Sequence, residues 1–265
     1  MTGEDIKKAA LRFGADVCGI GDIARFEGTP VSRDPRKILP NAKALIGLGI
    51  RVPAELYECM NRGLEYYAYT SLGVKAIDEE FTEVLLMKMA ALIEDEGYDA
   101  CLQRSTPNLK IKGDQSRNPE IIDTVILCDA RPVSPEKPPP DVILNFAECA
   151  EICGLGRAGL SGRVLSPRFG PYVRFGFIIT DMPLESDSVF GEALCDRCGA
   201  CIHACPGNAI DAEKGLDTWR CSEYYRGANQ CGPLMKGDIA GYVPCLCGKA
   251  CDRACHNHLK ETGII

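Results

Sequence analysis

The chain has 265 residues, of which 46% are hydrophobic, so it can bury one sizeable core or form one large and one small domain. Its net charge of −7 and its pI near 5.2 argue against a general nucleic-acid binder, because such proteins normally carry a basic surface. The N-terminus lacks a secretory signal pattern, and no apolar run reaches transmembrane length, so we expect a cytoplasmic protein without a membrane span.

The first fifty residues predict one helix and two strands. Apolar side chains recur at helical spacing over residues 4–14, with Thr2 as a plausible N-cap and Gly14 as the stop. Residues 15–20 predict a short buried strand. Residues 43–50 form an apolar run between two prolines, which favours a central strand.

The longest helical pattern covers residues 74–96. The apolar stripe that we expect on its buried face consists of Ile77, Phe81, Val84, Leu85, Met89 and Leu92. Residues 121–128 predict a further apolar strand, and the five prolines of residues 132–140 predict an extended connection. A helix over 143–153 and a strand over 172–180 follow.

A dense cysteine run follows this first part of the chain. Residues 195–206 read Cys-x2-Cys-x2-Cys-x3-Cys-Pro, the spacing of bacterial ferredoxins, in which three cysteines bind one iron–sulfur cluster and the fourth binds another. A zinc knuckle is the main alternative, but zinc sites usually pair two Cys-x-x-Cys hooks across a loop. The sixteen cysteines do not suggest a disulfide framework, because no secretory start accompanies them. We therefore predict that the cluster ligands here are Cys195, Cys198, Cys201 and Cys205.

Two four-iron clusters need eight thiolates. The first three cysteines of the run then need one distant partner, and Cys205 needs three. The four that we expect to complete the two sets are Cys221, Cys247, Cys251 and Cys255. The choice between Cys245 and Cys247 stays open, and Cys231 is left over.

Further segments share a recognisable order. Residues 33–43 contain RDPR and LPNAK, residues 154–159 form the glycine turn GLGRAG, and residues 168–184 contain RFG and GFIITDMPL. Together with the cysteine run and LDTWRC at 216–221, they resemble the epoxyqueuosine reductase family over most of the chain. That family is similar to the reductive dehalogenases.

The resemblance implies an α+β fold. A nitroreductase-like core would cover residues 1–190, and a double [4Fe-4S] ferredoxin-like domain would cover residues 191–265. It also implies cobalamin, bound base-off over a substrate pocket and reduced through the clusters. The family's catalytic acid corresponds to Asp129, which could protonate a reduced carbon if burial raised its pKa. A turn-forming role near Pro132 is the alternative for this aspartate.

The positions expected at the cofactor are Tyr67, Gly154, Gly156, Arg157, Gly159 and Arg168. The sequence departs from the family here, because Tyr67 replaces a histidine and the glycine turn lacks the family's tryptophan and lysine. Arginines near this turn could hold anionic groups of a cofactor, or they could form a solvated face.

We therefore expect an iron–sulfur oxidoreductase that passes electrons to a cofactor, a corrinoid on the resemblance, for reductive chemistry on a small molecule. The expected electron donor is a ferredoxin or flavodoxin. The alternative is an electron-transfer or corrinoid-reducing partner protein without substrate chemistry of its own. A flavin-linked reductase ranks last, because no flavin-specific motif is present.

Overall fold

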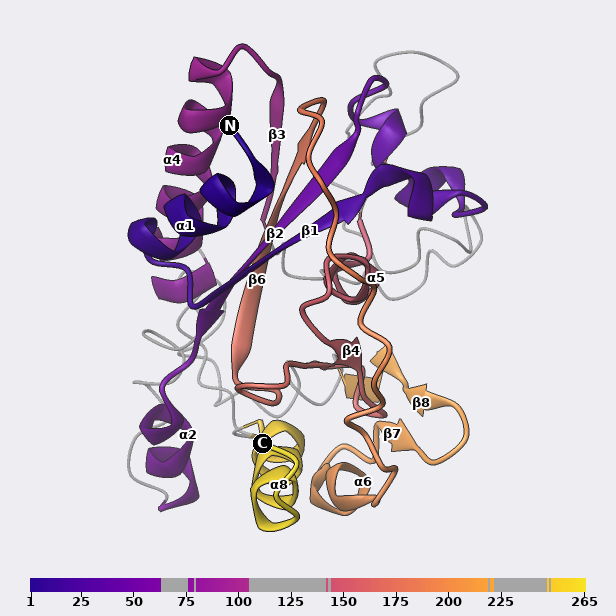
Figure 1. Ribbon diagram of the computed structural model, residues 1–265. Helices are drawn as coiled ribbons and strands as arrows, with labels where there is room; N and C mark the ends of the chain where they lie inside the picture. The colour runs from indigo at the N-terminus through magenta and orange to yellow at the C-terminus, as the bar shows by residue number, and fades with distance from the viewer. Residues whose placement is uncertain are drawn as a thin grey trace, which may run out of the picture.

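An antiparallel sheet organises the protein, for which we describe a computed structural model (Figure 1). In spatial order its strands are β1 (Val17–Asp22), β2 (Ala44–Arg51), β6 (Val173–Thr180) and β3 (Ala100–Gln103). The two central strands pair along their whole length, from Ala44 opposite Thr180 to Arg51 opposite Val173. Both are buried on both faces, as continuous apolar runs favour, so the predicted central strand at 43–50 is confirmed.

The structure describes residues 1–62, 76–78, 80–104, 142, 144–218, 220–221, 247 and 249–265. Several predictions lie outside this part of the chain: the strand at 121–128, the proline-rich connection at 132–140, and the roles of Tyr67, Asp129, Cys231 and Cys245.

Helices α1 (Gly3–Phe13) and α4 (Thr82–Asp95) cover one face of the sheet (Figure 1). The start of α1 is fixed by a capping box, in which Thr2 and Asp5 exchange side-chain and backbone hydrogen bonds. Its end is Gly14, which has a left-handed φ of 115° that suits glycine. The predicted first helix is therefore confirmed to within a residue at each end.

The buried face of α4 differs from the predicted stripe. The α-helix begins at Thr82, and Phe81 and Val84 are 63% and 46% exposed. Ile77, Leu85 and Met89 of the predicted stripe are buried, and the other buried positions of α4 are Thr82, Leu86, Ala90 and Ile93. Each helical residue advances by about 100°, so the face centred between Leu85 and Leu86 turns Val84 away from the sheet.

This assignment of α4 can be tested with two neighbouring residues. Leu86 is 1% exposed and packs near Gly176 of β6, whereas Met87 is 54% exposed. We expect Leu86→Ala to lower the free energy of unfolding by about 2–5 kcal/mol, and Met87→Ala to change it by less than about 0.5 kcal/mol. Denaturant unfolding followed by circular dichroism measures both. Equal effects would contradict the assigned face.

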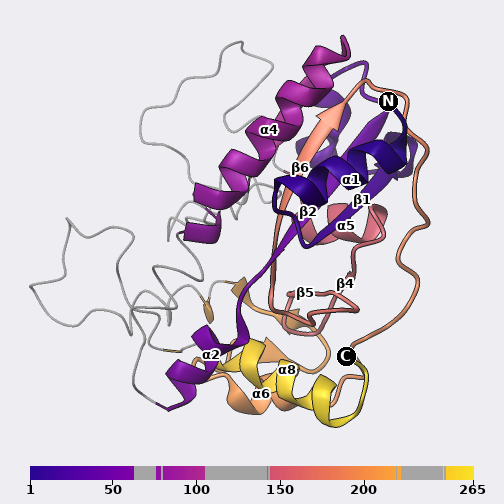
Figure 2. The ribbon, with the colours of Figure 1, turned by 60° about the vertical axis from the view of Figure 1, so that its left-hand side comes forward.

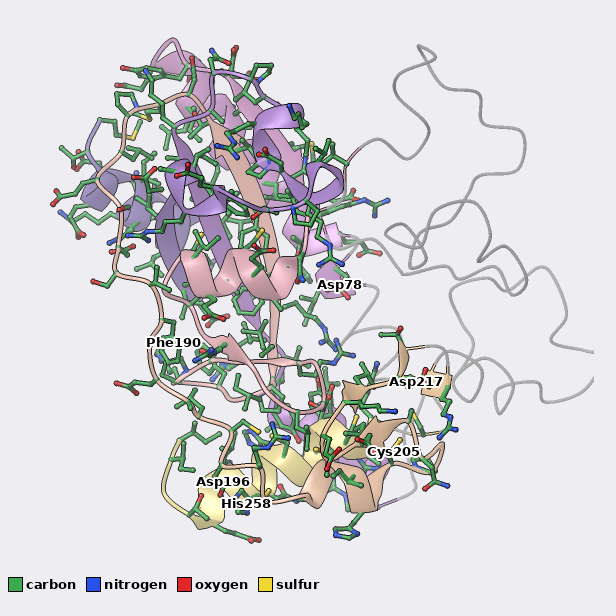
Figure 3. The ribbon with its side chains drawn as sticks, turned by 90° about the vertical axis from the view of Figure 1, so that its right-hand side faces the viewer. Asp78, Phe190, Asp196, Cys205, Asp217 and His258 are labelled. Carbon is green, nitrogen blue, oxygen red and sulfur yellow. The ribbon has the colours of Figure 1, made fainter. Side chains whose placement is uncertain are left out.

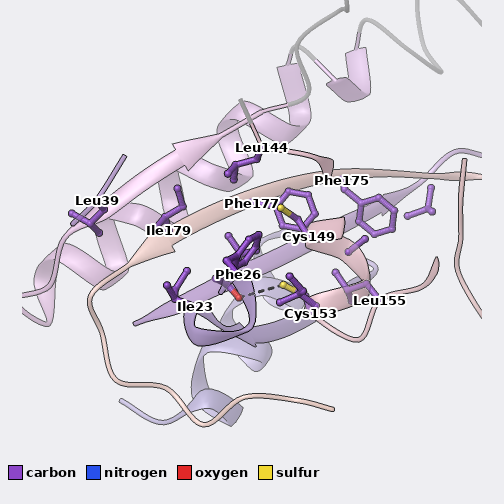
Figure 4. Packing of buried hydrophobic residues seen from close by; sticks show 14 of the residues in the cluster. Ile23, Phe26, Leu39, Leu144, Cys149, Cys153, Leu155, Phe175, Phe177 and Ile179 are labelled. Atoms are coloured by element: carbon purple, nitrogen blue, oxygen red, sulfur yellow. Dashed lines mark hydrogen bonds between the residues drawn. The ribbon is translucent and has the colours of Figure 1, made fainter. Parts of the chain in front are cut away.

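Helix α5 (Phe146–Ile152) covers the opposite face of the sheet, where Figure 4 shows its contacts with the core. Asn145 caps this helix by accepting hydrogen bonds from the N–H groups of Ala147 and Glu148. After the helix, the Cys153 thiol donates to the carbonyl of Leu45 on β2 at 3.3 Å. The predicted helix over 143–153 is confirmed in a shorter form.

The connection from β1 to β2 contains three 3-10 helices, η1 (Ile23–Phe26), η2 (Val31–Arg33) and η3 (Pro35–Lys37). Asp34 caps η3, since its carboxylate accepts from the backbone N–H and from Nε of Arg36, both at 2.9 Å. The RDPR segment therefore has a clear local role in shaping this loop.

In the first part of the chain, the sequence predicted neither α2 (Ala54–Asn61) nor the edge strand β3. Strand β3 is only four residues long and has no buried position, so it gives no apolar run.

The cysteine-rich end of the chain packs below the sheet. It contains the hairpin β4 (Arg157–Ala158) and β5 (Val164–Leu165), then α6 (Ala200–Ala204), β7 (Ile210–Asp211), β8 (Gly215–Leu216) and α8 (Ala250–Glu261). Helices α6 and α8 lie side by side (Figure 2). Leu165, Leu194 and Leu259 form a small core that joins the hairpin to α8. Within the described residues, every helix is too short or too polar to cross a bilayer.

Candidate metal centre

Four cysteines from two distant segments line one pocket. Cys195, Cys198 and Cys201 come from the loop and start of α6, and Cys255 comes from α8. Burial raises the pKa of the Cys255 thiol to about 12, and the next largest causes are the charges of Cys201 and Cys195. These four residues, which we call the first thiol set, are therefore within electrostatic reach of one another.

The loop around the first thiol set turns backbone donors toward sulfur. The N–H of Leu160, in the β4–β5 turn, donates to Cys195 Sγ at 3.5 Å. Arg197 and Gly199 have left-handed φ values of 61° and 80°, which let the chain curl between the cysteines. Donors of this kind favour thiolate over thiol, as iron–sulfur ligation requires.

A second group of four cysteines lies beside the first. Burial raises the pKa of the Cys221 thiol. The charges of Lys249 and Arg163 lower this pKa, whereas the charges of Cys247 and Cys205 raise it. Burial likewise raises the pKa of Cys251, and the charge of Cys247 raises it further. Cys247 is therefore within electrostatic reach of both Cys221 and Cys251, and Cys205 of Cys221, so we group these four residues as the second thiol set.

The N–H of Ala209 donates to Cys205 Sγ at 3.4 Å, so the second set also has a backbone donor at sulfur. The eight cysteines predicted as ligands thus fall into two groups of four. Each group joins part of the 195–205 run to α8 or the turn before it.

Asp196 and His258 tie the first cysteine loop to α8. His258 Nε2 lies 2.7 Å from Asp196 Oδ2, and this hydrogen bond lowers the pKa of Asp196 (Figure 3). Together with Cys198, these side chains place three possible ligand atoms within 4.8 Å of one another. Such a trio suits zinc as well, and it would compete with the first thiol set for Cys198.

The described residues predicted at a cofactor have separate local contacts. Gly154 and Gly156 shape the turn after α5 with φ values of 71° and 149°. Gly159 lies against Cys195 of the first thiol set. Arg157 pairs with Glu151 at 3.4 Å.

Arg168 lies over the Phe169 ring, with its guanidinium carbon 5.1 Å from the ring centroid. Arg157 and Arg168 are both exposed. Their exposure agrees with the interpretation that these arginines form a solvated face. Their role at a cofactor stays a prediction.

An aromatic stack links the sheet to α8, and sequence reasoning missed it. The Tyr172 ring lies between Tyr57 of α2 and His256 of α8, with centroid separations of 3.8 Å on both sides. His256 is 7% exposed, and burial lowers its pKa to about 4. Near the stack, Arg174 is buried, with Nη2 3.5 Å from the Tyr57 hydroxyl and Nε 3.8 Å from Asp78. No local sequence pattern predicts this stack, because its three rings come from separate segments of the chain.

Comparisons with known proteins agree with the cysteine run at 195–205. Residues 189–211 match the family model described as a 4Fe-4S binding domain. The chain is 25% identical to the epoxyqueuosine reductase of Bacillus subtilis (strain 168), over 77% of this chain and 45% of that protein. It is 24% identical to the epoxyqueuosine reductase of Synechocystis sp., over 89% of this chain and 69% of that protein. With the protein of Synechococcus sp. (strain CC9605), identity reaches 36% over 31% of this chain and 25% of that protein.

Solved structures extend the likeness to the fold. The epoxyqueuosine reductase from Streptococcus thermophilus matches with a TM-score of 0.52 at 16% identity, over 93% of this chain and 66% of that one. A catabolic reductive dehalogenase in complex with 3-bromo-4-hydroxybenzoic acid matches with a TM-score of 0.61 at 18% identity. The match covers 99% of this chain and 35% of that one. The resemblance to epoxyqueuosine reductases and reductive dehalogenases is therefore confirmed, and the chain spans less than half of the Bacillus relative.

Proposed function

We propose that this protein is an iron–sulfur oxidoreductase in which two [4Fe-4S] clusters deliver electrons to a corrinoid for reduction of a small molecule. The observation that carries the proposal is the grouping of eight cysteines into two sets of four. In this proposal a nitroreductase-like core covers residues 1–190 and the double-cluster domain covers residues 191–265.

The residues present fit two clusters. Four thiolates are the usual ligand number of a [4Fe-4S] cluster, and thiolates suit soft iron–sulfur sites. None of the cysteines within the described residues is held in a disulfide. Backbone donors at Cys195 and Cys205 would stabilise the bound state of each set. When bound, such clusters exchange single electrons.

The corrinoid is supported by fold and resemblance. One solved neighbour, with a TM-score of 0.60, is a reductive dehalogenase whose structure is described as suggesting a mechanism for B12-dependent dehalogenation. Asp129 would donate the proton to the substrate, and this role rests on the resemblance. A ferredoxin or flavodoxin would supply the electrons. The acidic net charge favours a small molecule over tRNA as substrate.

A second candidate is an electron-transfer or corrinoid-reducing partner protein. It is favoured by the departures from the family at Tyr67 and in the glycine turn, and by the ion pair that Arg157 makes with Glu151. In that case the clusters would assemble but no corrinoid would be retained.

Anaerobic reconstitution with iron, sulfide and cobalamin separates these functions. About eight irons per chain with stoichiometric base-off cobalt, seen by metal analysis and EPR, would support the corrinoid reductase. About eight irons without retained cobalt would favour the partner protein. Bound zinc without iron or acid-labile sulfide would overturn both, and would direct attention to Asp196, Cys198 and His258.

A further inference from the structure

One carboxylate joins the first cysteine loop to α8. Asp196 Oδ1 accepts a hydrogen bond from the Cys198 N–H at 3.0 Å, and Asp196 Oδ2 lies 2.7 Å from His258 Nε2. Because a carboxylate only accepts hydrogen bonds, the His258 ring donates this one through Nε2. Figure 3 labels the two side chains, which meet below the sheet. We call Asp196 and His258 the clasp.

The clasp lies at the most exposed of the predicted ligands. Cys198 is exposed, whereas the other seven cysteines of the two thiol sets are buried or partly buried. His258 follows Cys255 by three residues on α8, so the two side chains lie on the same side of that helix. Asp196 and His258 line the same pocket as the first thiol set. The clasp therefore connects the two segments that supply this set.

The loop at Asp196 has an unfavourable backbone conformation. Arg197, between Asp196 and Cys198, has a left-handed φ of 61°, which is costly for a residue with a Cβ. The hydrogen bond from the Cys198 N–H to Asp196 spans this residue, as in an Asx turn, and stabilises the conformation. Asp196 thus fixes the backbone at Cys198 with one oxygen and reaches α8 with the other.

Other contacts hold the neighbouring parts of this region. The Leu160 N–H donates to Cys195, which fixes the start of the loop against the β4–β5 hairpin. Arg163 Nε lies 3.4 Å from Asp252 Oδ1, and this ion pair fastens the same hairpin to α8. The clasp adds a direct connection from the Cys198 side of the loop to α8.

We propose that Asp196 and His258 are positioning residues that close the first thiol set around its cluster and slow the loss of that cluster. This inference rests on the proposed function, because it requires the first cluster. A cluster is lost once its thiolate ligands separate, and the exposed Cys198 is the ligand most open to solvent. Hydrogen bonds that orient metal ligands commonly change metal affinity by about 10- to 100-fold when they are removed.

The test is a chelator challenge of the anaerobically reconstituted protein, followed by iron release and by EPR of the reduced clusters. Variants Cys251→Ser and Cys198→Ser, each retaining one cluster, assign the EPR signals. We expect His258→Ala to speed the loss of the first cluster by about tenfold and to leave the second unchanged. His258→Gln, which keeps an N–H donor, should restore most of the retention. Asn257→Ala, at an exposed position of the same helix, is the matched control and should change neither rate.

A double variant tests whether the two residues act together. Asp196→Ala removes the acceptor of the Cys198 N–H as well, so the first cluster should be lost faster than in His258→Ala. Adding His258→Ala to Asp196→Ala should change the rate little further, because the clasp is already broken. Independent, multiplying effects of the two substitutions would contradict a shared contact.

Unchanged retention in His258→Ala, or equal acceleration for both clusters, would overturn the inference while leaving the two clusters in place. If His258→Ala assembles no first cluster, His258→Gln decides: full iron loading supports the clasp, and continued absence of the first cluster overturns it. Zinc bound by the unaltered chain and lost in His258→Ala would show that Asp196, Cys198 and His258 hold a metal ion of their own, which also overturns the clasp. Absence of iron from the unaltered chain would overturn the proposed function as well.

Discussion

Alanine at Cys198 and alanine at Cys255 are expected to remove the same cluster, although the two residues lie in different elements. Both side chains line one pocket between the α6 loop and α8. Losing one of four thiolate ligands should release that cluster, so iron should fall from about eight to about four per chain in either variant. Iron and acid-labile sulfide analysis after anaerobic reconstitution measures this loss.

Combining variants tests how the thiols are divided. Cys198→Ala with Cys255→Ala should lose no more iron than either alone, whereas Cys198→Ala with Cys251→Ala should lose nearly all of it. Cys101→Ser, on the edge strand β3, is the matched control and should keep both clusters. Cys231→Ser is expected to keep them too. Full iron retention in Cys198→Ala, or complete loss in the Cys198–Cys255 double variant, would refute the division.

Gly19→Ala is expected to destabilise the core strongly. A Cβ at Gly19 would lie 2.0 Å from the carbonyl oxygen of Cys153, which is backbone and cannot rotate away. Its partner across the β1–β2 pair, Gly47, is also crowded, but there a Cβ would lie 2.6 Å from the end of a side chain, Leu155 Cδ1. Overpacking of this kind costs about 3 kcal/mol of unfolding free energy. Denaturant unfolding of the variant measures the cost.

Gly191→Ala is the matched control for that loss. A Cβ at Gly191 meets nothing within 4 Å, and its backbone is not left-handed, so its stability should stay within about 0.5 kcal/mol of the unaltered chain. The chain just after Cys153 leads into the turn whose Leu160 N–H reaches Cys195. We therefore also expect reduced iron loading in Gly19→Ala. A Gly19→Ala protein as stable as Gly191→Ala would contradict the close packing of α5 on the sheet.

The sequence alone determined the features that depend on neighbours along the chain. The spacing of residues 195–206 predicted a cluster-binding loop, and the matching 4Fe-4S domain confirms it. Thr2 and Gly14 predicted the ends of α1, because helix caps are made by residues next to the helix. The apolar run in β2 predicted a central strand for the same reason: burial on both faces leaves no polar alternation.

Only the tertiary structure decided which distant groups meet. Spacing left the partner of the first three cysteines open among the later ones, and the packing of α8 against α6 puts Cys255 beside them. Nothing local to Arg163 points to Asp252, and nothing local to Gly19 points to Cys153. The sequence predicted Leu85 and Met89 on the buried face of α4 correctly, but only packing against the sheet decided that Leu86 is buried and Val84 exposed. A local sequence pattern reflects only the hydrogen bonds and the periodicity within one segment. The contacts between distant residues depend instead on how separate segments pack once their apolar faces are buried.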